Sequence, residues 1–489
     1  MGNPASAADT LNVQTLVDSP AISGERVAVI GGGLLGMTLA LRIAERGASV
    51  TLIEAAPELG GLAAPWTFGG VTWDRHYHVT LYSDAHLRAL LRGLDLESAM
   101  VWRGVGTGFF TGGRFHPMNG ALDFLKFPAL GPIDKLRLGL TIALASRIAD
   151  PLPLEDVTVE AWLTTWSGRT TFERIWKPLL RAKLGDRYRD ASAAFIWAII
   201  VRLYAARRAG LGAERFGYVP GGYATVIDAL RAKLVASGVE ILTGTAVERV
   251  RRKGADADHG ALAVEFRDSA DTERRFDRVV LTVPAPLAAK MAPDLAADER
   301  ERLASKVYGG IVCASLLLDA PLGPYYVTNL TDDWVPFTAV VDMANLVDRS
   351  AWNGQALAYL PKYVRPDDPL FDASDAEIEE SFLSALERMY PDFTRSRVRA
   401  FRISRARHVF PIATLGYSRA LPGIATSIPG LYTLNSAHIV NGTLNANETV
   451  SLAERALATI VAAERTLAST SPADRTPAAI SRVAAVGPA

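Results

Sequence analysis

The chain has 489 residues, of which 49% are hydrophobic, and its 52 Lys and Arg residues balance its 52 Asp and Glu residues. This length exceeds what one hydrophobic core usually fills, so we expect two connected domains. The balanced charge argues against a nucleic acid as the partner and favours a small molecule. A single cysteine, Cys313, forms no intramolecular disulfide and offers no paired metal or redox site, which fits a reducing cytoplasm.

The two ends of the chain, residues 1–24 and 466–489, indicate disordered tails, because small and polar residues dominate there without helical or strand periodicity. The first tail lacks the basic start and the apolar run of a signal peptide, so we do not expect secretion. The most apolar interior stretches, 136–148 and 195–203, are too short or too interrupted by Arg to cross a bilayer.

The first structured segment has the pattern of a strand, a glycine-rich turn, a helix and a second strand. β-branched residues at 26–30 precede the hexapeptide 31–36 (GGGLLG), a helical pattern covers 37–46, and a strand at 49–53 ends at Glu54. Gly31 permits the tight turn, Gly33 lets the backbone approach a pyrophosphate, and Gly36 lets helix and strand pack closely. The Glu54 carboxylate would accept hydrogen bonds from ribose hydroxyls and repel the 2′-phosphate of NADP. This combination predicts a dinucleotide-binding unit for FAD or NAD.

The residues that follow resemble the flavoprotein superfamily of amine oxidases, protoporphyrinogen oxidases, carotenoid desaturases and UDP-galactopyranose mutases. Residues 54–62 (EAAPELGGL) are similar to the extension whose paired glycines lie beside the FAD phosphates, although Gly60 and Gly61 alone would indicate an ordinary loop. Residues 68–78 (FGGVTWDRHYH) resemble the segment that passes the isoalloxazine ring. The resemblance continues as scattered segments through most of residues 25–465 and is closest to the protoporphyrinogen-oxidase-like branch. It implies FAD, bound without a covalent link.

Later segments extend this resemblance in the family order. Residues 218–223, a helix at 224–234 and strands at 239–242 and 245–247 are similar to the glycine turn, helix and adenine-side strand. Residues 278–284 resemble the strand and proline that return to the nucleotide domain, and a helix from 447 to about 463 resembles the closing helix, whose N-terminus faces the flavin pyrimidine. The motif and the resemblance together give the expected cofactor contacts: Gly31, Gly33, Leu34, Leu35, Gly36, Glu54, Ala55, Gly60, Gly61, Leu62, His78, Val247, Pro284, Asn447, Glu448 and Thr449.

These elements predict an α/β fold, with a Rossmann-like FAD-binding domain of the glutathione-reductase type and an interleaved α+β substrate domain. The FAD-binding domain would comprise residues 25–82, 215–285 and 427–465, and the substrate domain residues 83–214 and 286–426. The first insertion has helical periodicity over 157–167, 171–184 and 191–209, and the second alternates apolar and polar residues, as in 311–318 and 337–341. We expect the substrate pocket between the substrate domain and the flavin ring.

Two histidines are the candidate catalytic residues. In a strand, the spacing of His76 and His78 would place both side chains on one face, which suggests a metal pair, but no third ligand is visible and we predict no metal site. The resemblance implies that at least one of them lies near the flavin. There it would act as a proton acceptor or hold the ring by a hydrogen bond.

The strand at 308–315 bears on the chemistry. The amine oxidases carry a lysine there, whereas this strand has none, with Cys313 near its place and Lys306 nearby. We therefore expect an oxidoreductase in which FAD takes a hydride from a carbon of a bulky organic substrate and passes electrons to oxygen or another acceptor. The alternatives are a mutase-like enzyme acting on a nucleotide sugar without net redox change, and a flavin-holding protein without turnover. The polar segment 435–445 would contact the flavin or a hydroxylated substrate, or merely cap a turn.

A second open question is contact with a membrane. Residues 124–144 mix Lys126, Lys135 and Arg137 with Phe, Leu and Ile. This pattern is typical of a helix that lies on a lipid surface, and equally of a helix packed on its own domain with a solvated basic edge. We expect a cytoplasmic protein and keep peripheral membrane contact as an alternative.

Overall fold

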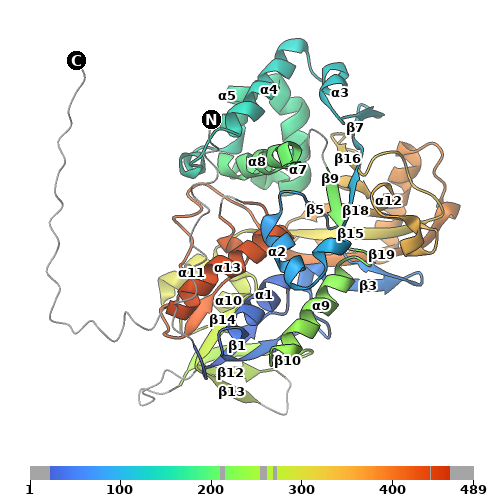
Figure 1. Ribbon diagram of the computed structural model, residues 1–489. Helices are drawn as coiled ribbons and strands as arrows, with labels where there is room; N and C mark the ends of the chain where they lie inside the picture. The colour runs from blue at the N-terminus through green and yellow to red at the C-terminus, as the bar shows by residue number, and fades with distance from the viewer. Residues whose placement is uncertain (1–21, 210–214, 254–261, 268–271, 441, 463–489) are drawn as a thin grey trace, which may run out of the picture.

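The computed structural model describes residues 22–209, 215–253, 262–267, 272–440 and 442–462 (Figure 1). The two tails expected from the sequence lie outside these residues, apart from 22–24. Helices gather at one end of the molecule, a long sheet crosses its middle, and a second sheet with its own helices forms the other end.

The second sheet is parallel and has five strands in the order β10-β2-β1-β14-β20. Four of the five residues of β1 and of β2 are buried, as expected for strands covered on both faces. On one face pack α1 (Leu34–Ala44), α9 (Tyr223–Ala236), α13 (Ala446–Ala462) and α2 (Ala85–Gly93), which share one apolar core with the sheet. The strands are β1 (Arg26–Ile30), β2 (Ser49–Ile53), β10 (Glu240–Leu242), β14 (Arg278–Leu281) and β20 (Leu431–Thr433).

The opposite face of this sheet is covered by a small antiparallel sheet and two short helices. The sheet consists of β11 (Val247–Arg252), β12 (Leu262–Phe266) and β13 (Glu273–Phe276). The helices are α10 (Ala285–Met291) and α11 (Ala297–Ala304), and their apolar residues form a separate core with the small sheet. The parallel sheet is therefore a middle layer, with helices on one side and strands and helices on the other.

The long sheet is mixed and has seven strands in the order β19-β15-β18-β17-β16-β7-β8. Strand β15, which lies between β19 and β18, is buried along all eleven residues, and α12 (Asp375–Met389), which begins at a capping box on Ser374, covers one face. The hairpin of β3 (Pro65–Phe68) and β4 (Val71–Asp74) contributes to the apolar core on the other face. The strands are β7 (Thr107–Thr111), β8 (Arg114–Pro117), β15 (Tyr308–Leu318), β16 (Val327–Leu330), β17 (Ala339–Asp342), β18 (Ala356–Val364) and β19 (Val398–Pro411).

The helical end is built from the first insertion. It contains α3 (Ala121–Lys126), α4 (Pro132–Ala145), α5 (Val159–Ser167), α6 (Arg169–Thr171), a π-helical turn (Phe172–Trp176), α7 (Lys177–Leu184) and α8 (Ala193–Ala209). Their apolar core includes Phe410 and Ile412 near the end of β19, so the helices pack on the long sheet. None of the described helices is long and apolar enough to cross a bilayer.

The division into two domains stays a proposal, and its boundaries differ from the packing, because α2, α10 and α11, expected in the substrate domain, share apolar cores with the parallel sheet. The parallel sheet takes its strands from three separate stretches of the chain, and the long sheet takes its strands from both insertions. Sequence periodicity underestimated the first insertion, which also supplies β6 (Val101–Gly104), β7 and β8. The β7–β8 turn is Gly112-Gly113, both with positive φ (59° and 72°), and this glycine pair between apolar residues was a usable hairpin signal.

Candidate functional site

The carboxyl ends of the parallel strands bring several predicted residues to one edge. Gly31 follows β1, Glu54 follows β2, Thr282 follows β14, and Asn435 lies shortly after β20. In open parallel sheets this edge is where ligands bind.

The glycine-rich turn packs so closely against its neighbours that two of its positions leave no room for a side chain. Gly31 has a φ of 114°, and a Cβ there would lie 2.5 Å from Thr282 Oγ1. A Cβ on Gly36 would lie 1.9 Å from the carbonyl oxygen of Gly31. Thr282 Oγ1 in turn donates to the carbonyl oxygen of Ile30 at 2.9 Å, which holds β14 against the turn. Helix α1 therefore starts directly against the end of β1.

The first turn of α1 faces a second stretch of bare backbone. Gly33 is the N-cap of α1 and offers no side-chain cap, so the backbone N–H groups of Leu34 and Leu35 begin the helix without one. Gly60 N–H donates to the Gly32 carbonyl oxygen at 2.8 Å, and a Cβ on Gly61 would lie 3.1 Å from the Gly33 Cα. Two glycine segments thus form a cradle next to a helix N-terminus, the arrangement that binds phosphate.

Glu54 is held at the end of β2 by backbone donors. Its Oε2 accepts from Gly32 N–H at 2.6 Å, and its Oε1 accepts from Ala56 N–H at 2.8 Å. Each carboxylate oxygen keeps a free lone pair for a ribose hydroxyl. Glu54 therefore shapes the glycine turn as well as offering an acceptor, a role that sequence reasoning did not assign. Ala55 beside it is exposed, whereas Leu62, just past the paired glycines, is half-buried.

Two further predicted contacts flank this edge. Val247 begins β11 and is 5% exposed, and Thr245 just before it donates its N–H to the Glu54 carbonyl oxygen at 2.9 Å. Pro284 is the N-cap of α10 and lies two residues beyond Thr282. Val247 and Pro284 thus lie near the same edge as Glu54.

The start of α13 needs a correction. The Asn447 side chain accepts from the N–H groups of His86 (2.9 Å) and Leu87 (3.2 Å), so it caps α2. Thr449 Oγ1 donates to the Asn445 carbonyl oxygen at 2.8 Å, and Glu448 N–H donates to Asn445 Oδ1 at 3.0 Å. The Asn447 and Thr449 side chains are therefore occupied within the protein, and a cofactor contact from residues 447–449 would come mainly from backbone groups.

The two candidate histidines do not form a pair. They follow β4 instead of lying in a strand, and His76 is buried with both ring nitrogens occupied: Nδ1 lies 3.2 Å from the Leu62 carbonyl oxygen and Nε2 lies 2.8 Å from Ser404 Oγ. His78 Nδ1 donates to the His76 carbonyl oxygen at 2.8 Å, which leaves its Nε2 lone pair available. Burial lowers the pKa of both imidazoles to about 4, so both are neutral at pH 7.

A buried carboxyl group lies next to His78. Asp74 Oδ2 is 3.9 Å from His78 Nδ1, and Asp74 Oδ1 accepts from Tyr223 N–H at 2.7 Å. Burial raises the pKa of Asp74 to about 7. The Tyr223 ring also packs on His78, with 4.7 Å between ring centroids. Packing and hydrogen bonds on these sides fix the orientation of the His78 ring.

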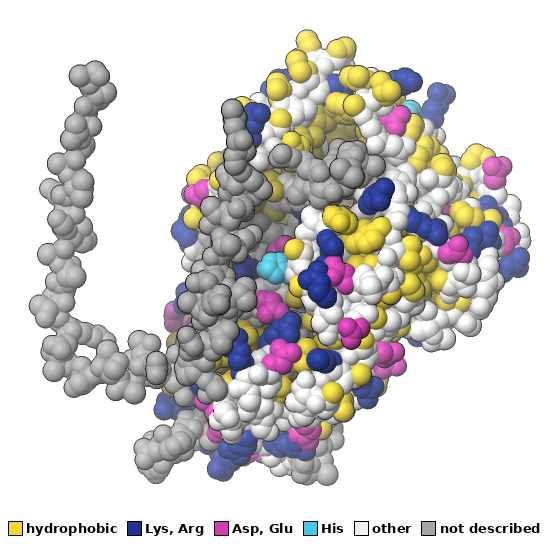
Figure 2. All heavy atoms as spheres, in the orientation of Figure 1, with side chains coloured by type: hydrophobic (Ala, Val, Ile, Leu, Met, Phe, Trp, Pro, Cys, Tyr) yellow, Lys and Arg dark blue, Asp and Glu magenta, His cyan; other side chains and the backbone are white. Residues whose placement is uncertain are grey.

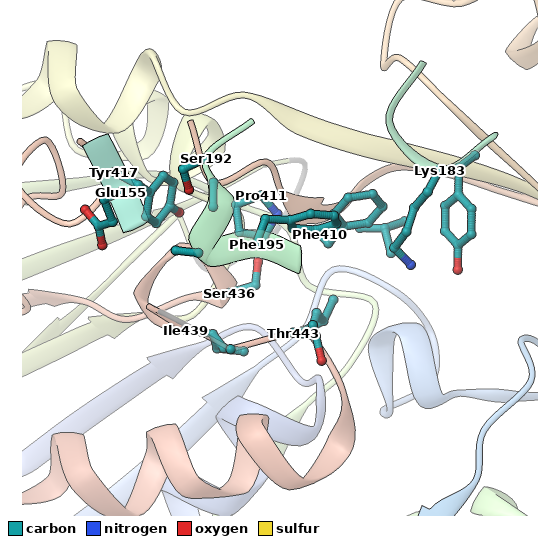
Figure 3. Close-up of a pocket in the computed structure, with 16 residues that line it drawn as sticks. Glu155, Lys183, Ser192, Phe195, Phe410, Pro411, Tyr417, Ser436, Ile439 and Thr443 are labelled. Atoms are coloured by element: carbon teal, nitrogen blue, oxygen red, sulfur yellow. The ribbon is translucent and has the colours of Figure 1, made fainter. Parts of the chain in front are cut away.

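A cavity of about 100 Å³ opens between the two sheets (Figure 3). Ser436, Ile439, Thr443 and Leu444, between β20 and α13, form one wall, and α7, α8, β18 and β19 supply the other. A second cavity of about 270 Å³ adjoins it, and Lys183 lines both. His76 and His78 line neither of these two cavities, but the hydroxyl of Tyr77 between them lies 2.7 Å from the hydroxyl of Tyr363, which lines the first.

Lys183 is the feature that sequence reasoning missed. It comes from α7, and its Nζ lies 4.5 Å from the ring centroid of Tyr363 and 5.2 Å from that of Phe410. Burial lowers the pKa of Lys183 to about 8. A signal existed, since Lys183 lies three residues after Leu180 and next to Leu184, both buried, and so falls on the apolar side of a helical pattern.

Strand β15 contains residues 308–315, where amine oxidases carry a lysine and this chain has none. Cys313 on it is fully buried, and burial raises the pKa of its thiol. Lys306, just before the strand, donates to the Ala420 carbonyl oxygen at 2.6 Å and packs over the Tyr417 ring. The lysine that reaches the first cavity therefore comes from the helical insertion and not from this strand.

Comparison with known proteins identifies the family. The sequence model of the family of flavin-containing amine oxidoreductases matches residues 36–444. A carotenoid phi-ring synthase from Streptomyces griseus is 27% identical over 461 residues, covering 85% of this chain and 82% of the relative. A coproporphyrinogen III oxidase from Propionibacterium freudenreichii subsp. freudenreichii is 24% identical over 300 residues, covering 50% and 56%. The crystal structure of a candidate protoporphyrinogen oxidase from Exiguobacterium sp. 255-15 superposes with a TM-score of 0.71 at 19% identity, covering 90% of this chain and 100% of that one.

These findings confirm the predicted fold class, the FAD cofactor and an oxidoreductase function. The glycine cradle, the uncapped N-terminus of α1 and the acceptor pair of Glu54 are the parts that a dinucleotide with a pyrophosphate and a ribose requires. The chain therefore belongs to the family of flavin-containing amine oxidoreductases.

Proposed function

We propose that this enzyme dehydrogenates a bulky, largely apolar substrate at a carbon atom, in the manner of protoporphyrinogen oxidases and carotenoid desaturases. The observation that carries the proposal is the wall of the first cavity, where Phe195, Val409, Phe410, Ile439 and Leu444 form an apolar surface beside polar groups such as Lys183, Ser436 and Thr443. Such a wall favours an apolar ring system or polyene over a small polar amine. The bulk of the proposed substrate rests on the names of the two curated relatives, a carotenoid phi-ring synthase and a coproporphyrinogen III oxidase.

The residues have separate roles in this proposal. FAD, when bound, supplies the hydride acceptor, and oxygen or another acceptor reoxidises it. The cradle of Gly31, Gly33, Gly60 and Gly61 would hold the pyrophosphate, and Glu54 the ribose. The remaining proposed cofactor contacts are Leu34, Leu35, Gly36, Ala55, Leu62, Val247, Pro284 and the first turn of α13. Cavity walls exclude water from the reacting carbon.

His78 is the proposed residue at the ring end of the cofactor. Its neutral imidazole has a free Nε2 lone pair, and its side chain is 21% exposed, so it can accept a hydrogen bond or a proton. His76, in contrast, is buried and has both nitrogens occupied, which supports a structural role for it. We therefore place His78 ahead of His76 as the group that takes part in the reaction.

An anaerobic screen tests the proposed reaction. The FAD-saturated protein is mixed without oxygen with carotenes, porphyrinogens, primary amines or nucleotide sugars, and bleaching of the flavin absorbance is followed. We expect bleaching by a polyene or porphyrinogen. Rapid bleaching by the amines alone would contradict the proposal. A uridine nucleotide that shifts the spectrum only after chemical reduction would favour the mutase-like alternative.

A second proposal concerns how an apolar substrate is reached: the helical end rests on a lipid surface. The expected amphipathic segment is two helices, α3 and α4, and five of their large apolar side chains are exposed by 61–75%. These are Leu122, Leu125, Ile133, Leu136 and Leu140. Figure 2 shows hydrophobic side chains gathered at this end, with basic side chains beside them. Exposed leucines together with Lys126, Lys135 and Arg137 complement an anionic bilayer.

Vesicle binding tests this surface. The protein should sediment with phosphatidylserine-containing vesicles, and Leu136→Glu, which puts a charge on the exposed face, should weaken that binding. Leu415→Glu is a matched control, because Leu415 is 47% exposed but lies outside α3 and α4. Equal sedimentation of the wild type and Leu136→Glu would contradict membrane contact through this face.

A further inference from the structure

A lysine without an acidic partner stands at the junction of the two cavities. Figure 3 shows Lys183 beside Phe410 at one end of the first cavity, with Glu155 and Tyr417 toward the other end. The Lys183 ammonium lies over the Tyr363 and Phe410 rings, and burial lowers its pKa. Among the described residues, no carboxylate lies within ion-pair distance of it. The charge is thus desolvated and neutralised only in part, by two ring faces.

The one carboxylate that lines the same cavity serves another contact. Glu155 Oε2 accepts from the backbone N–H of Ser418 at 2.9 Å and from its hydroxyl at 2.8 Å. This carboxylate therefore holds the loop after β19, at the opposite end from Lys183. A half-buried ammonium without a counterion is costly to maintain, so its place in a cavity wall points to a ligand that supplies the missing negative charge.

The second cavity, which Lys183 also lines, has an excess of basic residues in its wall. Its described lining contains four Lys and Arg residues and one acidic residue, although the chain as a whole has no net charge. Two of the four, Arg187 and Arg365, are paired with Asp190 and Asp367. Lys306 donates to the Ala420 carbonyl oxygen at 2.6 Å, so Lys183 is the lining cation without a hydrogen-bond acceptor among the described residues, and a singly charged anion matches it better than a phosphate.

We propose that Lys183 binds a carboxylate of the substrate, so that the substrate is an apolar molecule with an acid group and not a neutral hydrocarbon. The apolar body would lie against Phe195 and Leu444, and the acid group would lie at the rings of Tyr363 and Phe410. This inference rests on the proposed function, because it assigns the substrate class of the same cavity. Lys183 acts here as a specificity-determining residue and takes no part in hydride transfer.

Equilibrium binding tests the inference without any turnover. FAD-saturated protein at pH 7 is titrated with two matched pairs, decanoic acid with methyl decanoate and all-trans-retinoic acid with methyl retinoate, and the flavin spectrum or calorimetric heat is followed. We expect the wild type to prefer the acid in at least one pair. Lys183→Met should weaken acid binding by about ten- to a hundredfold and leave ester binding unchanged, whereas Lys183→Arg should retain most of it.

Lys177→Met is the matched control, because Lys177 lies on the same helix, is paired with Glu173 and lines neither cavity. Equal acid affinity of the wild type and Lys183→Met would overturn the inference. A wild type that prefers the esters, or binds neither acid, would overturn it as well. If acid binding depends on Lys183 but no carbon donor bleaches the flavin, the proposed dehydrogenation is refuted and the carboxylate site stands. If a neutral carotene is dehydrogenated equally by both proteins, this inference fails alone.

Discussion

Replacing Lys183 with Met should make the folded protein more stable. A fall in the Lys183 pKa from 10.5 to about 8 corresponds to about 3 kcal/mol against the protonated form in the folded state. Cation–π contacts with the Tyr363 and Phe410 rings offset about 1 to 2 kcal/mol of this free-energy cost. Methionine fills a similar volume without a charge. We therefore expect a gain of about 1 to 2 kcal/mol at pH 7, which is the opposite of what loss of a structural side chain would give.

The stability gain of Lys183→Met should depend on pH, because the pKa of Lys183 is lower in the folded protein than in the unfolded chain. Between pH 8 and 10.5 the unfolded chain holds the Lys183 proton more tightly than the folded protein does, so wild-type stability rises with pH in this window. The advantage of Lys183→Met should be complete below pH 8 and disappear toward pH 10.5. Thermal unfolding of the FAD-saturated proteins, followed by circular dichroism across this range, measures it. A variant less stable than the wild type at pH 7, or a difference independent of pH, would refute an uncompensated buried charge.

Other substitutions test the cofactor site. Gly36→Ala should expel FAD and destabilise the protein by about 1 to 3 kcal/mol, because its Cβ would lie 1.9 Å from a backbone oxygen; a variant that retains FAD would show that the turn yields. Glu54→Ala should weaken FAD binding by about 2 to 4 kcal/mol, and unchanged affinity in a fluorescence titration would show that the ribose lies elsewhere. His78→Ala should slow flavin reduction by about a hundredfold if His78 accepts a proton, whereas His76→Ala should lower the melting temperature at an unchanged rate per bound flavin; a rate for His78→Ala within about threefold of wild type would remove it from the mechanism. Heat or acid should release FAD into the supernatant, and flavin that stays with the precipitate would contradict non-covalent binding.

The nucleotide-binding part could be predicted from sequence because its constraints are local. The strands at 26–30 and 49–53 have the predicted bounds, since each is a short β-branched run that ends directly before a glycine or a charged residue. Gly31 and Gly36 could be assigned because their positions leave no room for a Cβ. The closing helix, predicted from 447 to about 463, begins at Ala446. In each case the signal and the structure that it specifies lie within about thirty residues.

The substrate side could not be predicted in the same way, because it depends on contacts between distant segments. Lys183 reaches the cavity only because α7 packs on β18 and β19, more than 150 residues later in the chain. Tyr77 meets Tyr363 across 286 positions, and no periodicity encodes that hydrogen bond. The spacing of the two histidines suggested one face of a strand, but the strand ends at Asp74 and the rings turn to different partners.

The most direct test of the central claim is a single anaerobic turnover analysed by mass spectrometry. FAD-saturated protein is mixed with a substrate from the screen in slight excess, the flavin absorbance is followed to completion, and the organic product is extracted. Dehydrogenation at carbon predicts one molecule of product, lighter than the substrate by two hydrogen atoms, for each flavin bleached. Flavin that dithionite reduces but no carbon donor bleaches, or bleaching that yields an aldehyde and ammonia from an amine, would contradict the account.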